Sequence, residues 1–248
     1  SNYIQFEMKK LFFTVFTLII CVNGVYAQDM VNEFGIFDHL SFGVTTGTQG
    51  LDFDVAAPVT DYVQVRAGYS FLPNITYKTD VNYTKKGNSY ETEIEAKLGI
   101  SNAKVLIDVY PFPISSFHAT MGAYIGTSSI ITVKNLQPIY GLNPGEGIEI
   151  ADYIIAPGDD GIAQGAIKVA AFKPYLGVGF GRSVPRGRVG VTTDFGLRFW
   201  GSPGVYEKRN GKYMKIKSSD ADGGGLLKFI SKITVYPMLT VRVSGRIF

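Results

Sequence analysis

Side chains that could carry catalysis or bind a metal ion are scarce in this chain. It contains two histidines, His39 and His118, and one cysteine, Cys21. One cysteine cannot form a disulfide framework or a cysteine-based zinc site, and two histidines disfavour a histidine-rich metal centre. A serine hydrolase needs its histidine beside a serine and an acid. The strand pattern of this chain places both histidines at one end of the fold, and an active site of this kind is expected at the other end. We therefore expect no enzymatic activity and no cofactor.

Other residues that could bind a ligand occur in patterns that are typical of turns, strands and loops. Asp159-Asp160-Gly161 and Asp220-Ala221-Asp222-Gly223 place acids beside glycine, as exposed turns do, and neither forms a complete calcium loop. Gly177, Gly179 and Gly181 alternate inside a strand-like run, which is not a dinucleotide-binding pattern. The basic stretch Lys208-Arg209-Asn210-Gly211-Lys212, with Lys215 and Lys217, could contact lipopolysaccharide phosphates or simply be a solvated loop.

The first part of the chain has the three regions of a secretory signal peptide. Met8-Lys9-Lys10 is basic, Leu11 to Val22 is apolar, and Val25-Tyr26-Ala27 ends in small residues suitable for cleavage. The apolar run is shorter than the roughly 20 residues of a membrane-spanning helix, which is the alternative interpretation. We expect translation to start at Met8, with residues 1–7 upstream, and cleavage to follow Ala27. The mature protein, residues 28–248, would then be exported and contain no cysteine, as suits an oxidising compartment.

Composition excludes further classes. Hydrophobic residues make up 46% and charged residues 18% of the chain, which argues against disorder. The net charge of +3 is too small to predict nucleic-acid binding.

Eight segments alternate between apolar and other residues with the period of a β-strand. Turn residues separate them, and convincing helical periodicity is scarce, with one short turn of helix conceivable at Asp29 to Phe37. The eight predicted strands are centred on residues 40–45, 51–55, 63–71, 104–109, 117–125, 176–180, 189–199 and 239–244.

The two faces of these strands differ in an unusual way. One face is almost wholly apolar or aromatic, and the other combines glycine with isolated charges of both signs. This composition fits the interior of a narrow barrel, in which glycine makes room and opposite charges pair. A solvated sheet face is the alternative. We expect the four bases to pair with the four acids inside the barrel; the eight residues are Asp52, Asp54, Arg66, Lys104, Asp108, Asp194, Arg198 and Arg242.

The connections alternate in length after the first turn at residues 47–50. Residues 58–61, 111–116 and 183–187 are short connections, whereas those around 73–96, 127–173 and 201–232 are long. Outer-membrane barrels have short periplasmic turns and longer external loops. The sequence therefore predicts an all-β, eight-stranded, antiparallel, up-and-down transmembrane barrel with long extracellular loops and both termini on the periplasmic side.

Several stretches carry a family resemblance. They are Lys173-Pro174-Tyr175-Leu176-Gly177-Val178-Gly179-Phe180-Gly181-Arg182, Asp194-Phe195-Gly196-Leu197 before Gly201-Ser202-Pro203, Ile107-Asp108-Val109-Tyr110-Pro111-Phe112, and the terminal Arg246-Ile247-Phe248. Together they resemble small outer-membrane barrels of Bacteroidetes type, loosely akin to OmpW and OmpX. The resemblance implies a location in the bacterial outer membrane, contact with its lipid and lipopolysaccharide, and insertion by the barrel-assembly machinery. The resemblance also implies that this machinery reads a terminal aromatic residue, here Phe248, whose parity is that of Arg242 unless a bulge near Gly245 intervenes.

Three functions remain open at this stage. The first is a structural or surface-interaction role for an outer-membrane barrel without catalytic activity. The second is a narrow channel or a binder for a small molecule, including a hydrophobic one, as the likeness to OmpW implies. The third is an exported soluble protein with a lipocalin-like or sandwich fold.

Overall fold

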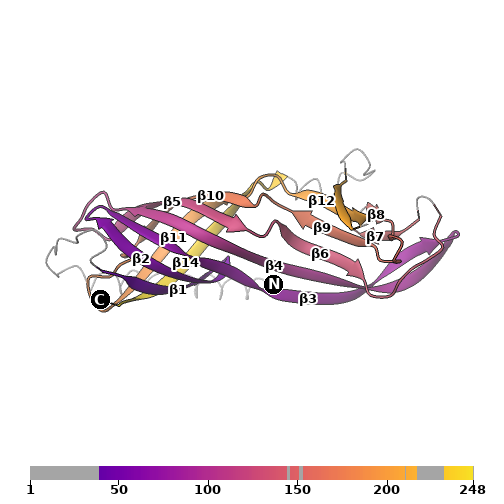
Figure 1. The fold of residues 1–248 in the computed structure, drawn as a ribbon, viewed down its shortest axis with the longest axis horizontal. Helices are drawn as coiled ribbons and strands as arrows, with labels where there is room; N and C mark the ends of the chain where they lie inside the picture. The colour runs from indigo at the N-terminus through magenta and orange to yellow at the C-terminus, as the bar shows by residue number, and fades with distance from the viewer. Residues whose placement is uncertain (1–38, 144–145, 151–152, 210, 217–231, 248) are drawn as a thin grey trace, which may run out of the picture.

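The chain folds into a closed, eight-stranded, antiparallel β-barrel with a sheet extension at one end (Figure 1). The computed structural model describes residues 39–143, 146–150, 153–209, 211–216 and 232–247, so the expected signal peptide, the short helical turn at 29–37 and Phe248 lie outside the described residues. The barrel strands are β1 (Ser41–Gly47), β2 (Gly50–Thr60), β3 (Val63–Lys85), β4 (Asn88–Val109), β5 (Phe117–Gly126), β10 (Phe172–Phe180), β11 (Val189–Phe199) and β14 (Val235–Arg246). These correspond to the eight strands that alternation predicts, and the fold class is confirmed.

The barrel closes because every strand pairs with two neighbours. The order around it is β4-β5-β10-β11-β14-β1-β2-β3, and β3 pairs back onto β4 from Val63↔Val109 onward. Alternation along each strand then separates the residues into an inner and an outer set. In β14, for example, Thr240, Arg242 and Ser244 are buried, whereas Leu239 and Val243 are exposed.

The predicted long connections are largely strands rather than loops. β3 and β4 continue well beyond the barrel as a hairpin that ends at Lys86-Gly87, where both residues have positive φ (51° and 78°). Two consecutive positive φ angles are the requirement of a tight turn whose twist matches the twist of the strands. The other two long connections supply β6 (Ser129–Asn135), β7 (Ile148–Ile150), β8 (Tyr153–Ile155), β9 (Gln164–Lys168), β12 (Gly204–Arg209) and β13 (Lys212–Lys215).

These six strands join the projecting hairpin to form the extension, visible on the right of Figure 1. β6, β9, β12 and β13 add in turn to the edge of β4, while β7 and β8 add to β3. A second apolar core forms here, built on Ile94, Ile139, Ile148, Ile155 and Ala163. The carboxylate of Glu146 accepts hydrogen bonds from the backbone N–H groups of Asn143 (2.8 Å) and Lys86 (2.7 Å), which hold its pKa below the ordinary value. The extension is therefore an ordered part of the fold with its own apolar core.

The other end of the barrel, here called the short-turn end, carries the connections at residues 61–62, 110–116 and 181–188. β1 begins at this end and β14 finishes at it, because Ser41 is paired with Arg246. The β14 register runs without a shift from Tyr236 to Arg246, so no bulge intervenes near Gly245. Among the described residues, no helix is long and apolar enough to cross a membrane.

Candidate functional site

All eight charged residues that the sequence places inside the barrel are buried. Their exposed fractions are 2% or less, and each lies on the inner face of its strand. Burying isolated charges is costly, so their neighbours decide whether the arrangement is stable. The structure brings seven of the eight together in two groups of ion pairs.

Arg66 of β3 is the centre of the first group. Its Nη2 lies 2.7 Å from Asp108 Oδ1 and its Nη1 lies 3.0 Å from Asp194 Oδ2. Asp194 also contacts His118, whose Nε2 is 2.7 Å from Asp194 Oδ1. Arg66 of β3 therefore binds an acid of the adjacent strand β4 and an acid of β11 across the interior, and His118 brings β5 into the same group.

The second group joins β2, β4 and β14. The ammonium group of Lys104 lies 2.8 Å from Asp52 Oδ2 and 2.9 Å from Asp54 Oδ2. Arg242 Nη2 lies 2.6 Å from the other oxygen of Asp54. Asp54 thus binds a cation through each oxygen, which is an efficient way to hold a buried carboxylate.

Polar residues close the interior at the short-turn end. Ser183 donates its hydroxyl to Asp108 Oδ2 at 2.5 Å, and its carbonyl accepts from Arg242 Nη1 at 2.7 Å. Tyr110 donates to Gln64 Oε1, which also accepts the backbone N–H of Val184. The turn at 181–188 is therefore bonded into the charged interior.

Sequence reasoning missed several members of this network. Alternation alone could have found both His118 and Gln64. Gln64 shares the parity of Arg66 on β3, and His118 lies between the outward-parity residues Phe117 and Ala119 of β5. No such signal exists for Ser183, which lies in a turn. Ser183 and His118 bond to different carboxylates, and both are completely buried, so the described interior offers no serine–histidine pair to a substrate.

Arg198 differs from the expectation that it pairs with an acid. Among the described residues it forms no ion pair, and its guanidinium instead lies 3.9 Å above the ring of Tyr124. In the register of β11 it is paired with Tyr175 on one side and Tyr236 on the other, so tyrosines surround it. A second buried cation, Lys173, lies at the same end and donates to Asn102 Oδ1 at 2.8 Å and to two backbone carbonyls.

This difference predicts a modest effect for Arg198→Leu. The variant loses a cation–π contact of about 0.5–2 kcal/mol, but it also removes an unmatched buried charge, which opposes the loss. We expect its thermal unfolding midpoint in detergent to stay within a few degrees of wild type. A fall comparable to that of a variant lacking Arg66 would show that Arg198 has an acidic partner after all.

The outer face of the barrel is apolar. Side chains of every barrel strand contribute exposed hydrophobic groups, including Phe42 (46% exposed), Leu176 (55%) and Phe195 (56%). Neighbouring rings stack along this face, as Phe42 does on Phe53 and Phe53 on Phe71. The barrel therefore has its charges inside and its hydrophobic residues outside, the inverse of a water-soluble protein.

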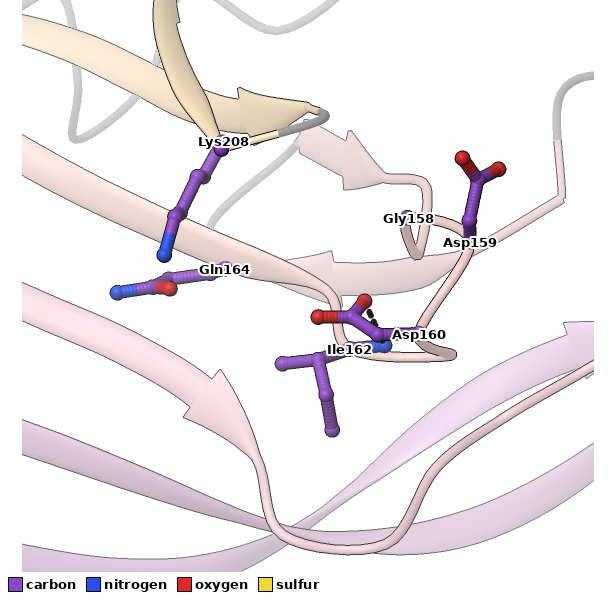
Figure 2. Close-up of a pocket in the computed structure, with 7 residues that line it drawn as sticks. Gly158, Asp159, Asp160, Ile162, Gln164 and Lys208 are labelled. Carbon is purple, nitrogen blue, oxygen red and sulfur yellow. Dashed lines mark hydrogen bonds between the residues drawn. The ribbon is translucent and has the colours of Figure 1, made fainter.

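A pocket of about 250 Å³ lies on the extension, between the 158–162 turn and the β12–β13 hairpin (Figure 2). Asp160 Oδ1 accepts the backbone N–H of Ile162 at 3.0 Å, so this carboxylate stabilises its own turn. Figure 2 shows the Asp159 carboxylate directed away from that of Asp160, and they do not converge on one point. Within the described residues no group of three metal-ligating side chains occurs, and Asp220 and Asp222 lie outside them.

Comparisons with known proteins return few matches. No protein-family model and no curated protein matches the chain. Two solved structures of Acinetobacter baumannii proteins are similar to it. The CarO2 structure has a TM-score of 0.47 and 17% identity, and the match covers 86% of this chain and 99% of that chain. The CarO structure has a TM-score of 0.45 and 17% identity, and the match covers 84% of this chain and 96% of that chain. Likeness at this level carries no functional argument, and it offers no support for the Bacteroidetes part of the expected resemblance.

Proposed function

We propose that this protein is an integral barrel of the bacterial outer membrane with a structural or surface-interaction role and no catalytic activity. The observation that carries the proposal is the inverted barrel: paired charges inside and a continuous apolar surface outside. In a lipid bilayer that outer surface is satisfied by acyl chains, and the closed ladder of strands leaves no unpaired edge. In water the same surface would be a large exposed hydrophobic patch, which soluble monomers avoid.

The extension supports one orientation of the barrel. Its outward face carries charged side chains, such as Lys97 and Lys134 on either side of Glu95. These residues belong in water, whereas the barrel face below them belongs in lipid. In our proposal the extension lies outside the cell and the short-turn end faces the periplasm, together with both termini.

The filled interior favours a structural barrel over a channel. Eight-stranded barrels are just wide enough for their own side chains, and here the side chains form ion pairs across the lumen. In this proposal the extension presents the surface that contacts other molecules. Lys212 and Lys215 of the β12–β13 hairpin are exposed and are candidate contacts for lipopolysaccharide phosphates, and the last strand is the proposed contact for the assembly machinery.

The test is membrane fractionation combined with a charge placed on the apolar face. We expect the native protein to remain in carbonate-washed outer membranes and to migrate differently on gels before and after heating. Val178→Arg should cost about 2–4 kcal/mol near the membrane midplane and reduce the folded fraction. Thr76→Arg, on an exposed position of the extension, is the matched control and should behave like wild type.

Two outcomes would contradict the proposal. Recovery of native protein in the soluble periplasmic fraction, with Val178→Arg folded normally, would favour the soluble alternative. Discrete conductance steps of the wild type in planar bilayers would favour the channel alternative, because a lumen closed by ion pairs should give none above background.

A further inference from the structure

The positive and negative charges of the barrel interior do not balance at one end. All four interior acids are bound by three cations, namely Arg66, Lys104 and Arg242. His118, bonded to Asp194, supplies the fourth positive charge when it is protonated. Among the buried cations of the barrel strands, Arg198 and Lys173 remain, and neither forms an ion pair with a described acid. The extension-end half of the lumen therefore carries an excess of two positive charges.

These two cations lie near each other. Arg198 is stacked on Tyr124, and Tyr124 is the residue paired with Lys173 between strands β5 and β10. Like charges placed on either side of one buried side chain repel one another. Beside them lies an apolar layer made of Leu106, Tyr124, Tyr175 and Met238. Repulsion in such surroundings is only weakly screened, so an arrangement of this kind is stabilised by a negative charge between the two.

Three buried hydrogen-bond donors in this region lack a partner. Arg198 is 2% exposed, yet its Nε and Nη2 have no partner, and neither has the Nδ2 of the completely buried Asn102. Asn102 accepts from Lys173 through its other side-chain atom, which fixes the amide nitrogen as a spare donor next to the ammonium group. Buried donors without acceptors are rare in proteins, and here they coincide with the unmatched charges.

We propose that Arg198 and Lys173 form a binding site for a small monovalent anion, a halide or the carboxylate group of a small organic acid. The adjacent Nε and Nη2 of a guanidinium match the two oxygens of a carboxylate, and a halide accepts the same pair of donors. The Asn102 amide and the Lys173 ammonium complete the positive side of the site. This site adds a ligand to the proposed structural role, and its test uses purified protein, so it does not depend on where the barrel resides.

The test is anion-dependent stability of the folded barrel in a zwitterionic detergent. The fraction of folded protein at each temperature is measured from the gel band that shifts on unfolding. Sodium chloride or sodium acetate replaces a bulky sulfonate salt at constant ionic strength. Because a ligand that binds only the folded state stabilises it, we expect a saturable rise in midpoint, about 3–6 °C at tenfold excess over Kd. A response to both salts, or to one of them, supports the site and identifies the anion class. No response to either overturns it.

Variants separate specific binding from general salt effects. Arg198→Gln and Lys173→Gln should each reduce the midpoint rise by at least half, and Arg198→Lys should retain part of it. Arg188→Gln, an exposed arginine at the short-turn end, is the control and should keep the full rise. An unchanged rise in both lumen variants, or an equal rise with the bulky sulfonate alone, would overturn the proposal. Should a variant fail to fold, bromide located by anomalous diffraction in the wild type decides, and its absence from the Arg198–Lys173 region counts against the site.

Discussion

Replacing Arg66 by leucine is expected to lower the free energy of unfolding by about 3–5 kcal/mol, the cost of leaving buried charges without their partner. Arg66 is 2% exposed and is the cation bound by both Asp108 and Asp194. Without it, Asp108 keeps only hydroxyl donors and Asp194 keeps only His118. For a chain of this size the loss corresponds to a fall of about 6–20 °C in the thermal midpoint, which unfolding in detergent measures.

A matched series tests whether charge pairing is the cause. Arg188→Leu removes an exposed arginine and should have little effect. A variant that combines Arg66→Leu with Asp108→Leu and Asp194→Leu should recover much of the loss, because a buried ion cluster can be replaced by apolar residues of similar volume. Equal loss in Arg66→Leu and Arg188→Leu would refute the role given to the interior network.

The inward direction of the charges could be predicted from sequence because it depends only on parity within a strand. Arg242, for example, alternates with Leu239, Val241 and Val243, and a one-residue slip would expose it to the apolar side. Which charges meet across the lumen depends on register between strands, and sequence alternation carries no such information. This explains the error at Arg198: neither strand beside β11 carries an acid, and pairing with Tyr175 and Tyr236 places it among tyrosines.

The extension could not be predicted for a related reason. Beyond residue 72, β3 carries polar residues such as Thr76, Lys78 and Asp80 beside apolar ones, and most side chains are exposed on both faces. A strand exposed on both sides loses the alternation that identifies a half-buried strand. The bulge between Leu72 and Ile75 also shifts the parity at the point where the barrel ends, which further hides the continuity of this strand.

Interior glycines give the second large expected effect. Gly43 of β1 lies on the inner face directly beneath the guanidinium of Arg242, so a Cβ at this position would overlap that group. Arg242 cannot move aside at low cost, because it is completely buried and bonded to both Asp54 and the carbonyl of Ser183. We expect Gly43→Val to cost about 1–3 kcal/mol from overpacking, and about 3–5 kcal/mol where the Arg242–Asp54 pair breaks.

The matched control is a glycine of the neighbouring strand that has open space around it. A Cβ at Gly245 of β14 would have its nearest neighbour, the carbonyl of Arg188, at 3.9 Å, so Gly245→Val should leave the unfolding midpoint almost unchanged.

Gly179→Val tests the same principle at the other ion group, since its Cβ would come within 2.5 Å of Asp194 Oδ1 and 2.7 Å of His118 Nε2. Both interior variants should unfold well below wild type, because glycine at these positions provides the volume that the ion pairs occupy. Normal stability of Gly43→Val and Gly179→Val would mean that the charged side chains can rearrange, and the interior would then be a loosely packed lumen instead of a fixed network.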